Sequence, residues 1–214
     1  MRLYVRRTAP NALKVLVFAA ERKITLDIVD VDALSLKEFR CISPLGIVPA
    51  LVTRNGSVLT ESLTICRYLD EVSPGELLFG HSAEERATIG MWERRSELML
   101  LNPGIDYIHH TLPELTQVTR QFPAWARQDA LSAAERLLPL MEAQLLRNRY
   151  LAGNRFSAAD ITAYFGCSAL KVFGLLPEPG PNLTEWLAWC GCRPSFAPLH
   201  AIASAKNSMA RIAL

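Results

Sequence analysis

The stretch SPLGIVPALVTRNGSVLTESLTICRYLDE, residues 43–71, decides the fold of this 214-residue chain. It holds two short apolar runs, Ala50–Val52 and Ser57–Leu59, on either side of the pair Asn55-Gly56. An Asn-Gly pair between apolar runs is among the strongest short-range signals for a β-hairpin. The following residues, from residue 60 onward, have the pattern of a helix, so the stretch predicts a β-β-α unit.

Two features of this unit suit the recognition of a small peptide or amino acid. Val48 and Pro49 leave main-chain groups free beside a strand edge, where an extended peptide can pair. Glu61 and Ser62 stand at the N-terminus of the predicted helix. There Glu61 can attract an ammonium group, while Ser62 and the helix N–H groups can receive a carboxylate.

The residues before this unit predict a β-α-β crossover. Leu3–Val5 and Leu26–Val31 read as strands, and Asn11–Arg22 reads as a helix with Pro10 in its first turn, where the missing N–H is not needed. The length of the crossover fits a parallel pair of strands. With a short helical link at Ser35–Arg40, the order becomes β-α-β followed by β-β-α, which is thioredoxin-like.

The rest of the chain predicts helices only. Ser73-Pro74-Gly75 ends the helix of the first part, and a linker runs from there to about His81. Beyond it, two capping boxes, Ser82–Glu85 and Ser157–Asp160, each open a helix. We therefore expect an α/β thioredoxin-like domain over residues 1–73 and an all-α helical domain over residues 82–214.

Prolines and glycines divide the helical part. We expect the first long helix to be interrupted or bent at Asn102-Pro103-Gly104 and to resume to about Thr111. The second long helix, from Pro123 to about Arg147, should be kinked or ended early by Pro139. The other expected helices run from Ser157 to near Gly174, from about Leu183 to Cys190 and from Ser195 to Ala205.

Composition excludes several classes of function. A net charge of +2, with scattered basic residues, gives little electrostatic support for nucleic-acid binding. The N-terminus MRLYVRR lacks the apolar core of a secretion signal, and no apolar run is long enough for a membrane span. A cytosolic protein is the default expectation.

The five cysteines lack C-x-x-C spacing, which indicates a reducing compartment and packing roles. Cys190 and Cys192 point nearly opposite ways on a helix, and His109 and His110 diverge by about 100°. No metal site is expected.

Three segments together resemble the soluble glutathione S-transferase superfamily of the bacterial type. LYVRRTAPNALKVLVFAAE, residues 3–21, is similar to its first strand, active-site turn and first helix. Residues 43–71 resemble its glutathione site, with a cis-proline at Pro49, and LAGNRFSAADITAYF, residues 151–165, resembles the capping segment of its second domain. The resemblance implies the two-domain fold of that family, glutathione as co-substrate and a homodimer. It also implies that Val48, Pro49, Glu61 and Ser62 bind glutathione.

One departure from the family concerns the sulfur of glutathione. Ala9 stands where many bacterial members have Ser or Cys, and alanine can neither donate nor attack. Thr8 and Asn11 remain, and their turn resembles the Thr-Pro-Asn turn of the nu class with one residue inserted. The resemblance therefore implies Asn11 and Thr8 as contacts of the thiol, although each can instead serve the helix start. Tyr4 is a third candidate, but its position in a strand favours the core.

Another departure concerns the glycine end of glutathione. Many relatives have Lys or a polar residue where this chain has Ile47, so the terminal carboxylate needs another cation. Lys37, Arg40 and Arg54 are available, and the sequence does not choose among them. Arg6 and Arg7 lie close to the proposed thiol position and could stabilise a thiolate there, but a solvated pair at a strand end is the favoured interpretation.

The resemblance places a second substrate against the first long helix of the second domain. The candidates that can turn toward this substrate are Trp92, Arg95, Met99, Asn102, Tyr107 and His109. At most two or three of them should line a pocket. Of these, Asn102 and Tyr107 are the predicted residues of the second-substrate pocket.

The expected function is an enzyme that binds glutathione and presents its thiolate to a small hydrophobic electrophile or a disulfide. The rival hypothesis is a non-catalytic member of the same fold, with a regulatory or interaction role. Glu61 and Ser62 favour the enzyme, whereas Ala9 and Ile47 favour the scaffold.

Overall fold

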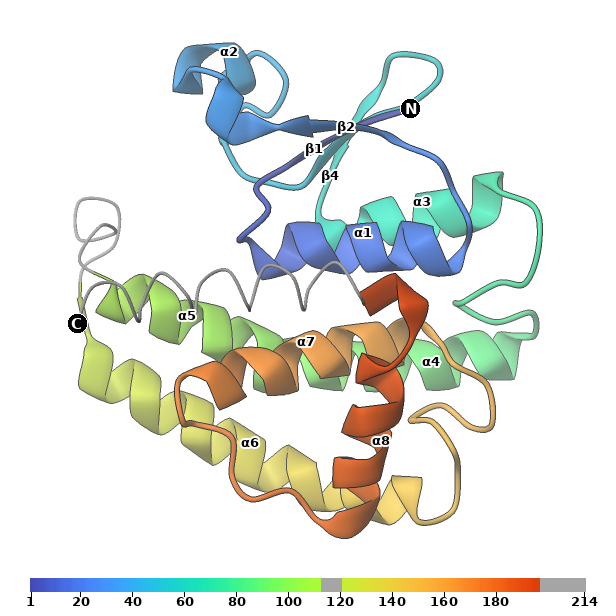
Figure 1. The fold of residues 1–214 in the computed structure, drawn as a ribbon, viewed down its shortest axis with the longest axis vertical. Helices are drawn as coiled ribbons and strands as arrows, with labels where there is room; N and C mark the ends of the chain where they lie inside the picture. The colour runs from blue at the N-terminus through green and yellow to red at the C-terminus, as the bar shows by residue number, and fades with distance from the viewer. Residues whose placement is uncertain (113–120, 197–214) are drawn as a thin grey trace. The chain divides into compact units, whose positions relative to one another are not determined.

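The computed structural model describes residues 1–112 and 121–196, which form two compact units (Figure 1). The first unit contains Met1–Leu77 and, among the described residues, also 191–196. The second unit contains Leu78–Cys190. The point of division thus falls inside the linker that the sequence predicts, while residues 191–196 group with the first unit.

A four-stranded mixed sheet forms the centre of the first unit. Its strands are β1 (Arg2–Val5), β2 (Asp27–Asp30), β3 (Ala50–Val52) and β4 (Val58–Thr60), in the spatial order β2-β1-β3-β4. β1 runs parallel to β2, whereas β1 with β3 and β3 with β4 are antiparallel. The predicted thioredoxin-like order is confirmed, with β4 one residue later in the sequence than predicted.

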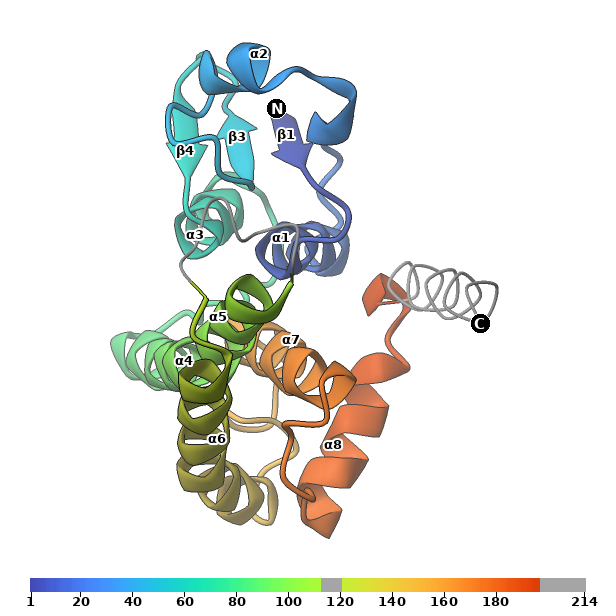
Figure 2. The same cartoon turned by 90° about the vertical axis from the view of Figure 1, so that its left-hand side faces the viewer.

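Alternation along β1 gives this sheet two covered faces. Successive side chains of a strand point to opposite faces, and Tyr4 lies on the face where it packs against Phe39 of the short helix α2 (Leu36–Arg40). Leu3 and Val5, both fully buried, therefore point to the other face. The helices α1 (Pro10–Glu21) and α3 (Ser62–Val72) contact each other and lie side by side in Figure 2.

A buried arginine fixes the C-terminal end of α3. Arg22, just after α1, pairs with Asp70 at 2.6 Å, and both side chains are 3% exposed. Its guanidinium also donates to the main-chain oxygens of Asp70, Ser73 and Pro74. Carbonyls at the end of a helix lack partners within it, so Arg22 satisfies groups that would otherwise remain unpaired.

Helices make up the second unit. In chain order they are α4 (Ala83–Ser96), a π-helical turn (Glu97–Leu101), α5 (Asn102–Thr111), α6 (Pro123–Leu145), α7 (Ala158–Val172) and α8 (Pro181–Gly191), whose last residue belongs to the first unit. A 3-10 turn, Pro194–Phe196, follows α8. The helix expected at Ser195–Ala205 lies mostly outside the described residues.

Two expectations about prolines need correction. The interruption expected at Asn102-Pro103-Gly104 lies one turn earlier, at Glu97–Leu101, and α5 begins at Asn102. The reason is that Pro103 has no N–H and its ring conflicts with the carbonyl four residues before it, so the hydrogen-bond pattern shifts upstream. Of the two outcomes expected at Pro139, the early end is wrong, because α6 continues to Leu145, and the kink stays a prediction.

Helix α7 contacts α4, the π-helical turn and α5, and a glycine allows the close approach. A Cβ on Gly166 would lie 2.5 Å from Cβ of Leu100, closer than any normal contact. Ten residues of α7 are buried, including Asp160 near the start of the helix. The prediction of a helix inside a bundle is therefore confirmed.

The carboxylate of Asp160 organises the start of α7. One oxygen accepts from the Leu151 N–H and the Trp186 Nε1–H, both at 3.0 Å. The other accepts from the N–H and the hydroxyl of Ser157, both at 2.9 Å. Burial raises the pKa of Asp160, and these four donors act in the opposite direction. The predicted capping role of Asp160 is thus confirmed, and it extends to α8 through Trp186.

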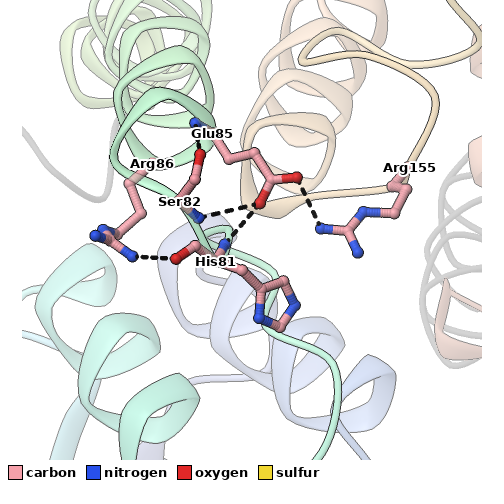
Figure 3. A network of polar contacts seen from close by, with 5 residues as sticks. All are labelled: His81, Ser82, Glu85, Arg86 and Arg155. Carbon is pink, nitrogen blue, oxygen red and sulfur yellow. Dashed lines mark hydrogen bonds and ion pairs between the residues drawn. The ribbon is translucent and has the colours of Figure 1, made fainter.

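The start of α4 carries the other predicted capping box, drawn in Figure 3. Ser82 Oγ accepts from the Glu85 N–H at 3.1 Å, and the Glu85 carboxylate accepts from the N–H groups of Ser82 and His81. Arg155 donates to the second carboxylate oxygen at 3.3 Å, and Arg86 donates to the His81 carbonyl. Unlike the box at Asp160, this network is exposed to solvent.

Candidate functional site

A pocket in the first unit gathers most of the residues to which the sequence analysis assigned glutathione binding. It lies where the loop before β3 meets the starts of α1 and α3, and its lining residues are Asn11, Ser43, Leu45, Ile47, Val48, Pro49, Thr60, Glu61 and Ser62. Its volume is about 50 Å³, far below the several hundred that enclose a whole small ligand. Only an end group can be enclosed, and the rest of a ligand must lie along the open surface.

The loop before β3 forms one wall of the pocket. The Val48-Pro49 peptide bond is cis, as predicted. The buried hydroxyl of Ser43 donates to the Ile47 carbonyl at 3.0 Å, which holds the loop together from inside. Val48 stands just outside β3, so its main chain lies at the end of the sheet, on the pocket wall.

The start of α3 forms the opposite wall and has an unusual backbone. Glu61 has a φ of +66°, which a residue with a side chain adopts at a cost of about 1–2 kcal/mol. No side chain caps the helix, and its first main-chain bond runs from the Ile65 N–H to the Glu61 carbonyl. The N–H groups of residues 62–64 therefore have no partner within the helix and can receive an anion.

A hydrogen bond joins the starts of α1 and α3 inside the pocket. The Ser62 hydroxyl donates to Asn11 Oδ1 at 3.2 Å, across 51 positions of sequence. Ser62 is 5% exposed, whereas Asn11 is half-buried. The sequence assigned Asn11 to the sulfur of glutathione and Ser62 to its γ-glutamyl group, and the structure brings these two residues into direct contact.

Thr8, in the turn before α1, does not line the pocket with these residues. Thr8 is exposed, and it is not among the pocket-lining residues. The residue preceding α1 is Ala9, which has no capping side chain, so Thr8 does not cap the helix either. The Ala9 carbonyl accepts from the N–H groups of Ala12 and Leu13, and the earlier N–H groups of α1 have no partner within it.

The alternatives to Thr8 and Asn11 have structural roles. Tyr4 is 8% exposed and packs in the core beside the sheet, which is the role that its position in a strand predicted. Arg6 pairs with Asp32 at 2.8 Å, and Arg7 lies 3.5 Å from Asp30. Both arginines are more than half exposed, so the solvated pair at a strand end is confirmed.

The three candidate cations for a terminal carboxylate lie in different places. A Cβ on Gly46, in the pocket loop, would lie 3.5 Å from Nε of Arg40. Arg54 instead lines a separate depression together with Tyr4. Lys37 is exposed on α2 and lines neither. Of the three, Arg40 therefore lies beside the loop that lines the pocket.

Three of the five cysteines are buried within the part of the chain that the structure describes. Burial raises the pKa of Cys167 to about 12, so this thiol is protonated at neutral pH. Cys66 and Cys190 are also buried, and only Cys41 and Cys192 are exposed. Within residues 1–112 and 121–196, no group of three or more His, Cys, Asp or Glu side chains could hold a metal ion.

The predicted second-substrate residues belong to the second unit. Asn102 is the first residue of α5, and Tyr107 packs its ring edge-on against Phe173 at 5.4 Å. Both are half-buried. The structure brings neither of them into the pocket that Glu61 and Ser62 line.

Sequence reasoning missed three lining residues, Ser43, Leu45 and Thr60. Ser43 precedes a proline and Thr60 precedes the helix start, positions at which hydroxyl side chains commonly bond to the main chain. That signal could have found both of them. Nothing local distinguishes Leu45, which is 74% exposed.

Comparisons with known proteins identify the same two parts of the chain. Residues 8–72 match the glutathione S-transferase N-terminal domain, and residues 107–194 match the glutathione S-transferase C-terminal domain.

No helix in the described residues is both long and apolar enough to cross a membrane.

The individual relatives include a protein named as a glutathione S-transferase and a protein named as an elongation factor. Glutathione S-transferase 2 of Saccharomyces cerevisiae is 31% identical over 170 residues, which are 78% of this chain and 72% of that protein. Elongation factor 1-gamma of Danio rerio is 30% identical over 158 residues, 72% of this chain but only 33% of that protein.

Among solved structures, a glutathione S-transferase domain-containing protein of Marinobacter aquaeolei VT8 superimposes with a TM-score of 0.81 at 32% identity. The match covers 92% of this chain and 100% of that one. Together with the two domain matches and the yeast relative, this likeness shows that the chain belongs to the bacterial type of the cytosolic glutathione S-transferase superfamily.

Proposed function

We propose that the protein binds glutathione in the pocket between the loop before β3 and the start of α3, and presents the thiolate to an electrophile or a mixed disulfide. The observation that carries this proposal is the Glu61-Ser62 helix start. It combines a strained backbone, an absent cap and free N–H groups in one pocket. Strain of this kind persists where the surrounding structure holds it, commonly at ligand sites.

Each part of glutathione has a partner in this arrangement. The Glu61 carboxylate attracts the ammonium of the γ-glutamyl end, and the free N–H groups of α3 receive its carboxylate. The main chain of Val48 pairs with the cysteinyl residue beside Pro49, as an extended peptide pairs with a sheet edge. We propose Arg40 as the cation for the glycine carboxylate, because it lies beside the pocket loop.

The sulfur must be ionised for either reaction. A thiol with a pKa of about 8.5 is only about 3% thiolate at pH 7, and lowering its pKa by two units requires roughly 2.7 kcal/mol. The predicted donors are Thr8 and Asn11, with the N–H groups at the start of α1 as support. Because no cysteine lies in the first turn of α1, the chemistry would proceed on the sulfur of glutathione itself.

Other parts of the expectation belong to the same proposal. A small hydrophobic electrophile or a disulfide would be the second substrate, with Asn102 and Tyr107 as its proposed contacts. A homodimer in the cytoplasm, with residues 1–73 binding glutathione and residues 82–214 serving the second substrate and dimerisation, is also proposed. The exposed Leu45 and Ile47, at 74% and 56%, are apolar groups that a dimer contact could cover.

The second candidate function is a non-catalytic regulatory or interaction protein of the same fold. Ala9 favours it, because this residue leaves the usual position of the nucleophile or donor without a functional side chain. The likeness to elongation factor 1-gamma also favours it, since the match extends to a protein that is not named as a transferase. The two candidates differ in whether bound glutathione is activated.

Calorimetric titration with glutathione tests the proposal directly. Binding, followed by a drop in the thiol pKa seen in the ultraviolet absorbance of the thiolate, supports the enzyme. Binding without such a drop, and without turnover of aromatic electrophiles or mixed disulfides, supports the non-catalytic candidate. Failure to bind glutathione removes every enzymatic version of the proposal.

A further inference from the structure

Asn11 has a position that separates it from the sulfur contacts with which the sequence grouped it. It is the second residue of α1, and its side chain reaches the start of α3, where Oδ1 accepts from the Ser62 hydroxyl. Both residues line the pocket together with Glu61, whereas Thr8 does not. Asn11 therefore shares its surroundings with the amino-acid end of the proposed ligand.

The hydrogen-bonding capacity of this pair is divided unevenly. A serine hydroxyl has one hydrogen, and Ser62 uses it on Asn11, so the oxygen faces the pocket as an acceptor. The amide nitrogen of Asn11, Nδ2, carries two hydrogens, and it donates no hydrogen bond to any group within residues 1–112 and 121–196. The pocket thus offers an acceptor pair, Glu61 and Ser62, and a separate donor, Asn11 Nδ2.

We infer that Asn11 binds the α-carboxylate of the γ-glutamyl group through Nδ2, positions the Ser62 hydroxyl through Oδ1, and is not a donor to the sulfur. An α-amino acid has an ammonium and a carboxylate on one carbon, which matches adjacent acceptors and donors. The N–H groups of residues 62–64 supply the remaining donors to the carboxylate. This inference rests on the proposed glutathione binding and names the ligand atoms that Asn11 contacts.

A consequence is that the γ-glutamyl group and the sulfur of glutathione depend on different residues. The sulfur is left with Thr8 and the N–H groups at the start of α1. A change at Asn11 should then alter affinity and leave the acidity of the bound thiol as it was. The sequence-based assignment predicts the reverse, a weaker acid with a smaller change in affinity.

Two ligands without an ionisable thiol isolate the amino-acid end. One is S-methylglutathione, and the other is the same compound with the γ-glutamyl α-carboxylate replaced by a carboxamide. Calorimetry on wild type, Asn11→Ala and Asn11→Asp gives a cycle between residue and ligand. The matched control is Asn154→Ala, an exposed asparagine in the second unit, and circular dichroism confirms folding.

We expect Asn11→Ala to bind S-methylglutathione about tenfold more weakly than wild type, as when one hydrogen bond to a charged group is lost. The carboxamide ligand should cost wild type about tenfold and cost Asn11→Ala much less, because the contact is already absent. Asn11→Asp keeps an acceptor for Ser62 but replaces the donor by a negative charge, so it should lose more affinity than Asn11→Ala. Asn154→Ala should bind as wild type does.

Three results would overturn the inference while glutathione binding stands. They are unchanged affinity of Asn11→Ala for S-methylglutathione, independent and additive losses in the cycle, or a raised thiol pKa of glutathione bound to Asn11→Ala. A wild-type protein that binds neither glutathione nor S-methylglutathione would overturn the proposed function, and this inference with it.

Discussion

The starts of α3 and α7 use similar residues in opposite ways. At α7 the acidic residue, Asp160, lies inside the first turn, is fully buried and accepts four hydrogen bonds. At α3 the acidic residue, Glu61, comes before the first turn, is exposed and has a positive φ. One start is completed by its own chain, whereas the other leaves its N–H groups open.

This difference shows how a helix start becomes either a structural joint or a binding site. Every N-terminus has unpaired N–H groups and a partial positive charge. When a residue of the chain satisfies them, the free energy contributes to folding. When none does, the same groups are available to an external anion, and the fold must be stabilised by other contacts.

The largest expected effect is on stability, at the start of α7, where Asp160 satisfies the donors. Asp160→Ala leaves four donors without their acceptor in a buried site, so the free energy of unfolding should fall by about 3–5 kcal/mol. Urea unfolding measures it, with Asp160→Asn as the milder control because one acceptor oxygen remains. Glutathione affinity of the folded variant should be unchanged; lost affinity at preserved stability would place Asp160 in the binding site.

At the start of α3, where the N–H groups have no partner in the helix, a substitution should change glutathione affinity. Glu61→Ala removes the partner of the ligand ammonium in a partly enclosed pocket, so glutathione should bind about 2–4 kcal/mol more weakly. Calorimetry on wild type and variant gives the difference. A variant that binds glutathione as tightly as wild type would remove Glu61 from the site.

The positive φ at residue 61 separates strain from binding. Glycine adopts this conformation without the steric cost that alanine has, so Glu61→Gly should be more stable than Glu61→Ala by about 1 kcal/mol. Both should lose glutathione affinity equally, because both lack the carboxylate. Equal stability in urea would mean that the backbone at this position is not strained in solution.

The exposed box at α4 should give the smallest effect and a dependence on pH. Hydrogen bonds donated by the main chain of His81 and Ser82 lower the pKa of Glu85 from its ordinary 4.5. A lowered carboxyl pKa contributes stability above the unfolded value that is lost as the pH falls through the folded value. Glu85→Gln should thus lower the melting temperature at pH 7, by less than Asp160→Ala, and this effect should disappear as the pH falls through the lowered pKa of Glu85 in the folded protein. A difference that persists in acid would contradict this origin.

Much of the fold could be predicted because its signals are local. The Asn55-Gly56 turn, the two capping boxes and the helix boundary at Ser73 depend on residues within four positions of one another. The π-helical turn could not be placed, because the sequence marks Pro103 while the backbone adjusts one turn upstream. The early end expected at Pro139 was wrong, because α6 continues past it to Leu145, whereas a kink at Pro139 stays a prediction.

The site was predictable in part for the same reason. Residues 43–71 contain both walls of the pocket, so their juxtaposition follows from a short chain segment. The contact between Asn11 and Ser62 spans 51 positions and depends on how α1 packs on α3, which no local pattern records. The sequence therefore named several residues that line this pocket, but it did not show that Asn11 and Ser62 contact each other.

Anchorage of α3 at one end has a consequence for the exchange of its amide hydrogens. Arg22 holds the C-terminal end through Asp70, Ser73 and Pro74, while the first three N–H groups have no acceptor in the helix. Amides from Ile65 onward should exchange slowly with deuterium, and those of residues 62–64 should exchange quickly. Bound glutathione should slow those three in particular, so the uptake of deuterium along one helix would report occupancy of the site without any measurement of turnover.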